Sequence, residues 1–179
     1  MKKITLLLLY LSVLTIGAQE KLTSSKSVIQ FEASVPLFEE VKAQNNEVKC
    51  VLIPHKSQIT FVAFIDKFEF KRSLMKAHFN NNYIESHRYP KAVFKGNIEK
   101  FDLKDINEIE KEYLINGKME IHGESKKISV TAKIMKTVNG IQITSDFILN
   151  ADDFKIEIPT IVIAKVSKYV TTHIECVLK

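Results

Sequence analysis

The stretch ISVTAKIMKTVNGIQI, residues 128–143, contains two runs of alternating apolar and polar residues on either side of Asn139 and Gly140. Alternation with a period of two is typical of a β-strand that has one face in the core and the other in water. Asn-Gly between two such runs favours a tight hairpin, because both central residues of that turn need positive φ. The stretch therefore predicts two antiparallel strands.

The same period of two recurs through most of the chain after Ser27, for example in residues 29–35 and 48–52. Two further runs, QITFVAFI (58–65) and IPTIVIAKV (158–166), are more continuously apolar and are predicted as strands covered on both faces or passing between environments. The last strand is expected at 170–178. About eight or nine strands indicate an all-β protein, a single antiparallel sandwich or barrel.

One segment, residues 73–83, has helical spacing instead. Ser73 is a suitable N-cap, and the apolar and aromatic residues that follow lie near one helical face. Three asparagines, residues 80–82, are poor helix formers, so we expect the helix to end there and a loop to continue to Tyr89 and Pro90. This short helix would flank or plug one end of the barrel.

The chain begins MKKITLLLLYLSVLTIGAQ, with a basic start, an apolar run and then small residues. This order is typical of a secretory signal peptide, residues 1–18, followed by one domain at residues 19–179 that is periplasmic or otherwise exported. A retained membrane anchor is the alternative, which the short apolar run disfavours. Export would permit a disulfide between Cys50 and Cys176, but the pairing depends on a distance that the sequence does not contain.

Several function classes are disfavoured by composition. The formal net charge is +5, but Lys and Glu are scattered instead of forming a basic stripe, so we expect no nucleic-acid partner. The glycines are too far apart for a phosphate-binding loop, and no Gly-x-Ser-x-Gly elbow occurs. The five histidines lack metal-binding spacing, and His122 is expected to support a hairpin. A metal-assisted enzyme that uses His78, His87 or His122 remains an alternative.

Three segments carry a resemblance to a known family: KFEFKRSLMKAHFNNNYIESHRYPKAVFKG (67–96), INGKMEIHGESKKISV (115–130) and SDFILNADDFKIEIP (145–159). The helix and Asn-rich loop before Tyr-Pro-x-Ala-x-Phe, and the later Gly-x-x-x-Ile-His-Gly, resemble the YceI-like family of exported bacterial lipocalin-like proteins, in particular its short Bacteroidetes-type members. The resemblance runs from about Val28 to the last strand. It implies an eight-stranded lipocalin-like barrel with one short helix.

The resemblance also implies a carrier that holds a polyisoprenoid, isoprenoid quinone or similar long amphiphile inside the barrel, with no catalytic residue, no metal and no cofactor. The partners expected are a hydrophobic isoprenoid or fatty-acid-like ligand and, transiently, the membrane or envelope proteins, with the protein a monomer or homodimer. Strand alternation and the helical face together predict the ligand-binding residues Phe31, Phe61, Phe70, Leu74, Met75, Phe79, Tyr83, Phe94, Ile121 and Phe147.

A different function remains open. The interior of an eight-stranded barrel is just wide enough either to be filled by side chains or to hold one slender ligand. A filled barrel would favour an interaction protein of the cell envelope that docks a partner on its surface and has no internal ligand.

Overall fold

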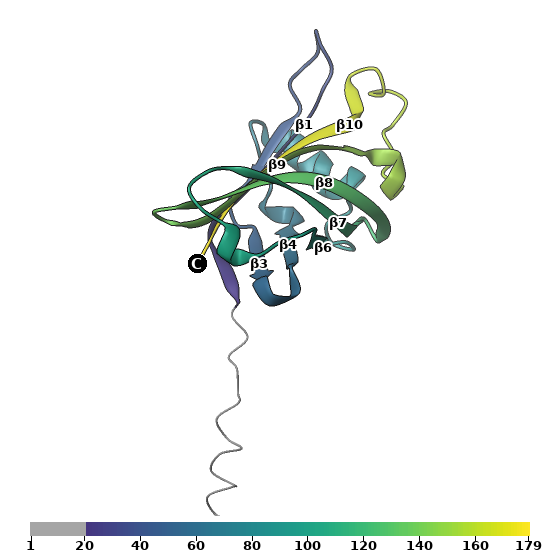
Figure 1. The fold of residues 1–179 in the computed structure, drawn as a ribbon. Coiled ribbons are helices and arrows are strands. Elements are labelled where there is room, and N and C mark those ends of the chain that lie inside the picture. Colours follow the sequence, from purple (N-terminus) through teal and green to yellow (C-terminus); the bar gives the residue numbers. More distant parts are fainter. Residues whose placement is uncertain (1–20) are drawn as a thin grey trace, which may run out of the picture.

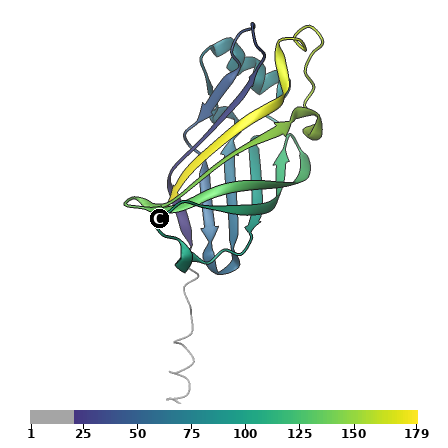
Figure 2. The same ribbon diagram turned by 45° about the horizontal axis from the view of Figure 1, so that its top comes forward.

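The computed structural model describes residues 21–179, and the predicted signal peptide at residues 1–18 lies outside them. Eight antiparallel strands form a closed barrel (Figure 1 and Figure 2), so the predicted fold class is confirmed. The barrel closes where β10 pairs with β1. In chain order the eight strands are β1 (Leu22–Ser34), β3 (Lys49–Ile53), β4 (Gln58–Phe64), β6 (Lys91–Ile98), β7 (Lys111–Ile121), β8 (Glu124–Thr137), β9 (Gly140–Asn150) and β10 (Val166–Leu178).

Two short strands, β2 (Lys42–Asn45) and β5 (Glu69–Phe70), extend the wall at one end of the barrel. β2 pairs with β1 in the same register as β3 does, so β2 and β3 are one strand interrupted at residues 46–48. The buried side chain of Asn45 spans this interruption. It donates to the carbonyl oxygen of Phe64 at 2.9 Å and accepts from the backbone N–H of Glu47 at 2.8 Å. Both ends of the buried amide are therefore hydrogen-bonded where the wall bends.

The turn with two positive φ angles lies at His122 and Gly123, not at Asn139 and Gly140. His122 and Gly123 join β7 to β8 with φ of 53° and 75°. The predicted hairpin between β8 and β9 does form, but of Asn139 and Gly140 only Gly140 has a positive φ, at 132°. Glycine is required there because a Cβ would lie 2.2 Å from the carbonyl oxygen of Leu178.

The predicted role of His122 as a hairpin support is confirmed. Its Nδ1 lies 3.0 Å from the carbonyl oxygen of Phe154, and its Nε2 lies 3.4 Å from the carboxylate of Glu85. The ring of Tyr89 packs edge-on against the imidazole with centroids 4.7 Å apart. A Cβ on Gly123 would lie 2.7 Å from that tyrosine ring. The hairpin is therefore joined to the segment after the helix, and the Tyr-Pro and His-Gly motifs meet in one cluster.

The helical segment is longer than predicted. Helix α2 (Ser73–His78) is the one α-helix of the described residues, and Ser73 is its first residue instead of its cap. A π-helical turn, η4 (Phe79–Tyr83), then continues through the asparagines where a loop was expected. Asn80 fits there because its side-chain amide donates to the carbonyl oxygen of Lys76 at 2.9 Å. Within residues 21–179, no helix has the length and apolar character needed to cross a membrane.

The prediction of a strand at residues 158–166 is wrong. Residues 160–165 form turns, and β10 begins at Val166. Pro159 has no N–H to give to a strand ladder, and Val162 accepts backbone hydrogen bonds from Lys165 and Val166. Ile161 is 86% exposed and Ile163 59%, so part of the apolar run lies at the surface.

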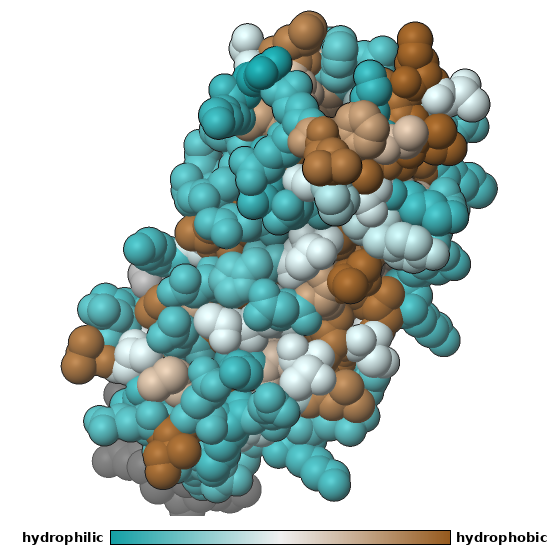
Figure 3. All heavy atoms as spheres, turned by 90° about the horizontal axis from the view of Figure 1, so that it is seen from above, coloured by the Kyte–Doolittle hydropathy of each residue, from teal (hydrophilic) through white to brown (hydrophobic). Residues whose placement is uncertain are grey.

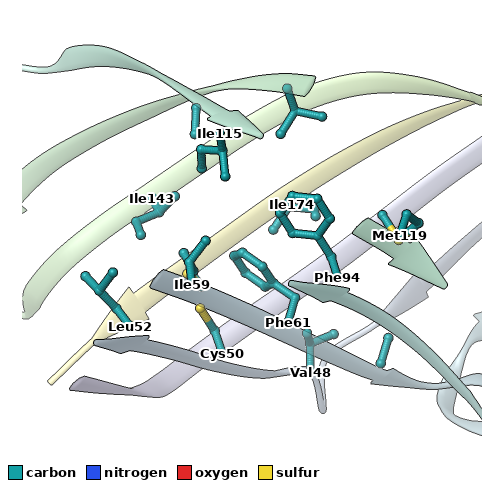
Figure 4. Close-up of a cluster of buried hydrophobic side chains, with 14 of the residues drawn as sticks. Val48, Cys50, Leu52, Ile59, Phe61, Phe94, Ile115, Met119, Ile143 and Ile174 are labelled. Atoms are coloured by element: carbon teal, nitrogen blue, oxygen red, sulfur yellow. The ribbon is translucent and has the colours of Figure 1, made fainter. Parts of the chain in front are cut away.

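One half of the barrel interior is filled by aliphatic side chains (Figure 4). The largest with less than 2% exposure include Leu52, Ile59, Ile115, Ile134 and Ile143. Cys50 and Cys176 are buried as free thiols. Burial, and secondarily the contact with Cys176, raises the pKa of the Cys50 thiol.

An aromatic cluster of Phe31, Phe68, Phe70 and Phe79 holds the helical segment on the barrel. The ring centroid of Phe79 lies 5.4 Å from that of Phe31, 5.9 Å from that of Phe68 and 5.1 Å from that of Phe70. Phe79 belongs to η4, whereas the others come from β1, β5 and the residue just before β5. The cluster therefore fixes where the helical segment covers the end of the barrel.

The first prediction concerns the packing of Gly123 against Tyr89. An alanine at position 123 must keep a positive φ and places its Cβ against the tyrosine ring. We expect Gly123→Ala to lower the free energy of unfolding by about 1–2 kcal/mol or more, measured by urea denaturation. Ser125→Ala, on an exposed position of β8, is the control and should change it by less than about 0.5 kcal/mol. Equal urea midpoints for the two variants would contradict the close packing.

The second prediction concerns the aromatic cluster. Phe70→Ala and Phe79→Ala should be non-additive in a double-mutant cycle, with a coupling energy of about 0.5–1.5 kcal/mol for the ring pair. Phe79→Ala combined with Phe101→Ala is the control, because Phe101 contacts Tyr113 instead of the cluster. Additive effects for Phe70 and Phe79 would show that their contact does not hold the helical segment.

Candidate ligand-binding cavity

A cavity of about 460 Å³ occupies the other half of the barrel interior. Its wall is built from inward-facing residues of β1, β4, β6, β7, β9 and β10. The other wall residues come from residues 39–41, 65–72 and 151–165, and from the helical segment with Ile84, which follows it. The volume is within the range of about 300–1,000 Å³ that is usual for small-molecule sites. The barrel is therefore filled at one end and hollow at the other.

Small side chains explain why the space is at this end. Ala63 on β4 lies opposite Ala92 on β6, and both point into the cavity. Four residues earlier on β4, the same face carries Ile59, which is 1% exposed in the filled half. Ala33 on β1 adds a third small side chain to the hollow half. Because the width of the barrel is set by its strands, replacing isoleucine-sized side chains by alanine leaves space.

All ten residues that the sequence predicts as ligand-binding lie on the cavity wall. They are Phe31, Phe61, Phe70, Leu74, Met75, Phe79, Tyr83, Phe94, Ile121 and Phe147. Their depths differ: Phe61 and Phe94 are 6% exposed, whereas Leu74 is 65% exposed at the mouth. The geometry thus brings the predicted residues together, and their contact with a ligand stays a prediction.

The wall also contains residues that the sequence reasoning missed. Some share a strand face with predicted residues, such as Ile29 beside Phe31 and Leu149 beside Phe147, and the same alternation could have found them. Others, such as Ile158 and Val162, come from the segment wrongly predicted as a strand. Their place depends on turns that no period in the sequence indicates.

Charged groups of the cavity wall lie at its mouth. Arg72, just before α2, forms an ion pair with Glu39 of the β1–β2 connection, and both side chains are about half exposed or more. Lys165 and His78 also reach this rim. In contrast, the wall between the mouth and the filled half is almost entirely aliphatic and aromatic, with Thr172 of β10 as a polar residue. The site can therefore hold an apolar chain inside and a polar group outside.

Exposed apolar side chains surround the mouth as well. They are Leu37, Phe38, Leu74, Ile161 and Ile163, on the three segments that contribute Glu39, Leu74 and Val162 to the wall. Figure 3, a view from above, shows apolar side chains gathered at one end of this face. The entrance to the cavity is thus less polar than an ordinary loop surface.

The histidines do not form a metal site in the described part of the chain. No group of three or more His, Cys, Asp or Glu side chains suited to a metal occurs within residues 21–179. His122 is engaged with Glu85 and is not part of the cavity wall. The Arg88 guanidinium, 3.1 Å from the Glu85 carboxylate, and secondarily His122, hold the pKa of that carboxyl below its ordinary value. This cluster joins structural elements and does not face the cavity.

Comparison with known proteins supports the fold. A polyisoprenoid-binding domain from Saccharophagus degradans, implicated in plant cell wall breakdown, superposes with a TM-score of 0.77 at 12% identity, over 88% of this chain and 97% of that domain. Burkholderia cenocepacia BcnA gives a TM-score of 0.68 at 12% identity over 84% of this chain and 95% of BcnA. The Campylobacter jejuni YceI protein gives 0.60 at 19% identity over 81% of this chain and 89% of that protein.

Comparison with curated protein sequences found no significant match. The model of the YceI-like domain family, however, matches residues 21–178, which is almost all of the described barrel. The resemblance seen in the sequence is therefore confirmed, and the chain belongs to the YceI-like family.

Proposed function

We propose that this protein is an exported carrier that binds the apolar tail of one amphiphile, such as a polyisoprenoid or isoprenoid quinone, inside the barrel. The observation that carries the proposal is the cavity of about 460 Å³, which has apolar walls and charged residues at its mouth. Membership of the YceI-like family and the fold shared with a domain named as polyisoprenoid-binding support it. Export to the periplasm rests on the signal-peptide pattern of residues 1–18.

The energy of binding comes from burial and needs no directed polar contact. Each 100 Å² of tail surface removed from water contributes roughly 2.5 kcal/mol, at about 25 cal/mol per Å². Part of this gain is offset by the lost freedom of the ligand, so the length of tail that enters decides the affinity. In the proposal the six phenylalanines among the predicted residues, with Ile121, surround the tail. Leu74, Met75 and Tyr83 cover it from the helical segment.

The polar head of the ligand would lie at the mouth. Glu39, Arg72 and Lys165 are the charged groups of the wall at the mouth. Beyond their ion pair, Arg72 has further N–H groups to donate and Glu39 has further oxygen lone pairs to accept hydrogen bonds. The proposal contains no catalytic step, because the wall offers contact surface and no pairing of a nucleophile with a base. Docking or release at a membrane or envelope protein would take place at this end.

The alternative function, an interaction protein with no internal ligand, requires a filled barrel. The cavity is the observation against it, because the space left by Ala33, Ala63 and Ala92 lies behind a covering helix instead of on an exposed surface. We therefore propose the carrier function alone.

The third prediction tests ligand binding. The full chain, expressed with its signal sequence and recovered from the cell envelope, is examined by native mass spectrometry, and bound molecules are then extracted and identified. We expect one amphiphile per chain with a long apolar tail. A bare polypeptide, both from the native host and after incubation with prenols, would contradict the carrier function.

A pair of variants relates that result to the cavity. Ala92→Phe places a phenyl ring inside the cavity, in space that several methylene groups of the ligand would otherwise occupy. Burial of each methylene group contributes about 0.8 kcal/mol to binding. We expect the folded variant to lose at least about tenfold in ligand occupancy. Ala132→Phe is the matched change in the filled half, where the nearby void measures only about 20 Å³, and it should destabilise the fold by about 1–3 kcal/mol. Unchanged occupancy in folded Ala92→Phe would place the ligand elsewhere.

A further inference from the structure

The cavity ends abruptly halfway along the barrel. Five side chains line both the cavity and a separate void of about 20 Å³ on the filled side of them. These five residues, which we call the floor, are Phe61, Phe94, Met119, Phe147 and Ile174. In the strand register Phe94 lies opposite Phe61 on one side and Met119 on the other, so three of the five form one continuous layer. The floor is therefore a partition between two spaces of very different size.

Two glycines leave room for the ring of Phe94 in this layer. Gly96 on β6 lies directly opposite Gly117 on β7, one inward position below the pair of Phe94 and Met119. A Cβ on Gly117 would lie 2.5 Å from the ring of Phe94, and one on Gly96 would lie 2.9 Å from it. The ring of Phe94 thus covers the bare backbone of both glycines, as aromatic rings do beside strand glycines in other sheets.

This arrangement makes Phe94 the main obstacle below the cavity. Its side chain is 6% exposed and its ring lies against the glycine pair. Figure 4 shows Phe94 among the buried side chains of the interior, beside Phe61 and Met119. Beyond it lies the small void, which is lined besides the floor by Ile115, Ile128, Val130, Ala132, Ile143 and Ser145. Without the ring, the space above the two glycines and the small void would both adjoin the cavity.

We propose that the floor, with Phe94 as its determining residue, sets the longest apolar tail that this barrel accepts. The inference rests on the proposed function and adds to it a ligand class: amphiphiles whose tail fits in one half of the barrel. A longer tail either leaves its last units in water at the mouth or does not enter fully. Affinity should therefore rise with tail length only until the tail reaches the floor.

The fourth prediction measures this limit. Geraniol, farnesol, geranylgeraniol and solanesol share one head group and one repeat unit, so they differ in tail length alone. Their dissociation constants for the full chain are measured by titration in native mass spectrometry. For the unchanged protein we expect the affinity to increase along the series and then to stop increasing. One buried methylene is worth about fourfold in affinity, so the step at which the increase stops is easily resolved.

Phe94→Ala should move that step to a longer prenol and raise the affinity for that prenol at least tenfold over the unchanged protein. Gly117→Ala should move it the other way, because the new methyl group displaces the ring toward the cavity. If Phe94→Ala does not fold, Phe94→Leu replaces it, because leucine keeps an aliphatic group over the glycines. We expect Phe94→Leu to move the step to a longer prenol as well, but by less. Phe101→Ala is the matched control: Phe101 is buried to a similar degree, at 9% exposure, but lines neither space.

The outcomes separate this inference from the function on which it rests. A shift in the Phe94 variants but not in Phe101→Ala supports the floor as the length limit. Prenol binding with the same length dependence in all folded variants overturns the role of Phe94 and leaves the carrier function intact. Failure of the unchanged protein to bind any prenol or other long-tailed amphiphile overturns the carrier function itself.

Discussion

Closure of the eight-stranded barrel fixes the width of its interior, so the volume of each inward side chain decides where space remains. In the filled half, leucine and isoleucine side chains such as Leu52 and Ile59 leave only a small void of about 20 Å³. In the other half, the opposed pair Ala63 and Ala92 leaves a cavity. The position of the site thus follows from side-chain volume on a common scaffold, and the rest of the molecule covers, bounds or opens that space.

Two clusters keep the cavity in shape at its open end. Phe79 packs among three other phenylalanines and so holds the helical segment over the barrel. Below it, His122 connects the β7–β8 hairpin with Glu85 and Tyr89. Through these contacts the Tyr-Pro and His-Gly motifs pack against each other. The helical cover is therefore fixed by packing at Phe79, near its middle, and by the contacts of Glu85 and Tyr89, which follow its C-terminal end.

Solved structures share this fold with the present chain at very low sequence identity. Solved structures at 12% identity superpose over more than four fifths of the chain, although few residues agree. Burial of a tail depends on the amount of apolar surface and on the shape of the space, and many combinations of side chains supply both. Preference among ligands would then lie in the few positions that bound the space, such as Phe94 and the rim residues Arg72 and Glu39.

The alternating pattern by itself determined most of the strands and the faces they turn inward, which is why the six predicted residues on strands line the cavity. The four on the helical segment, Leu74, Met75, Phe79 and Tyr83, followed from helical spacing. The alternating pattern did not determine the turns at residues 160–165, the π-helical turn after α2 or which hairpin needs two positive φ angles, because these depend on local backbone geometry. Nor could it show which half of the barrel is hollow or that Phe94 lies over Gly96 and Gly117. Those features arise only when the register brings residues from distant strands into one layer, where their summed volume, and not the character of any one residue, decides what space is left.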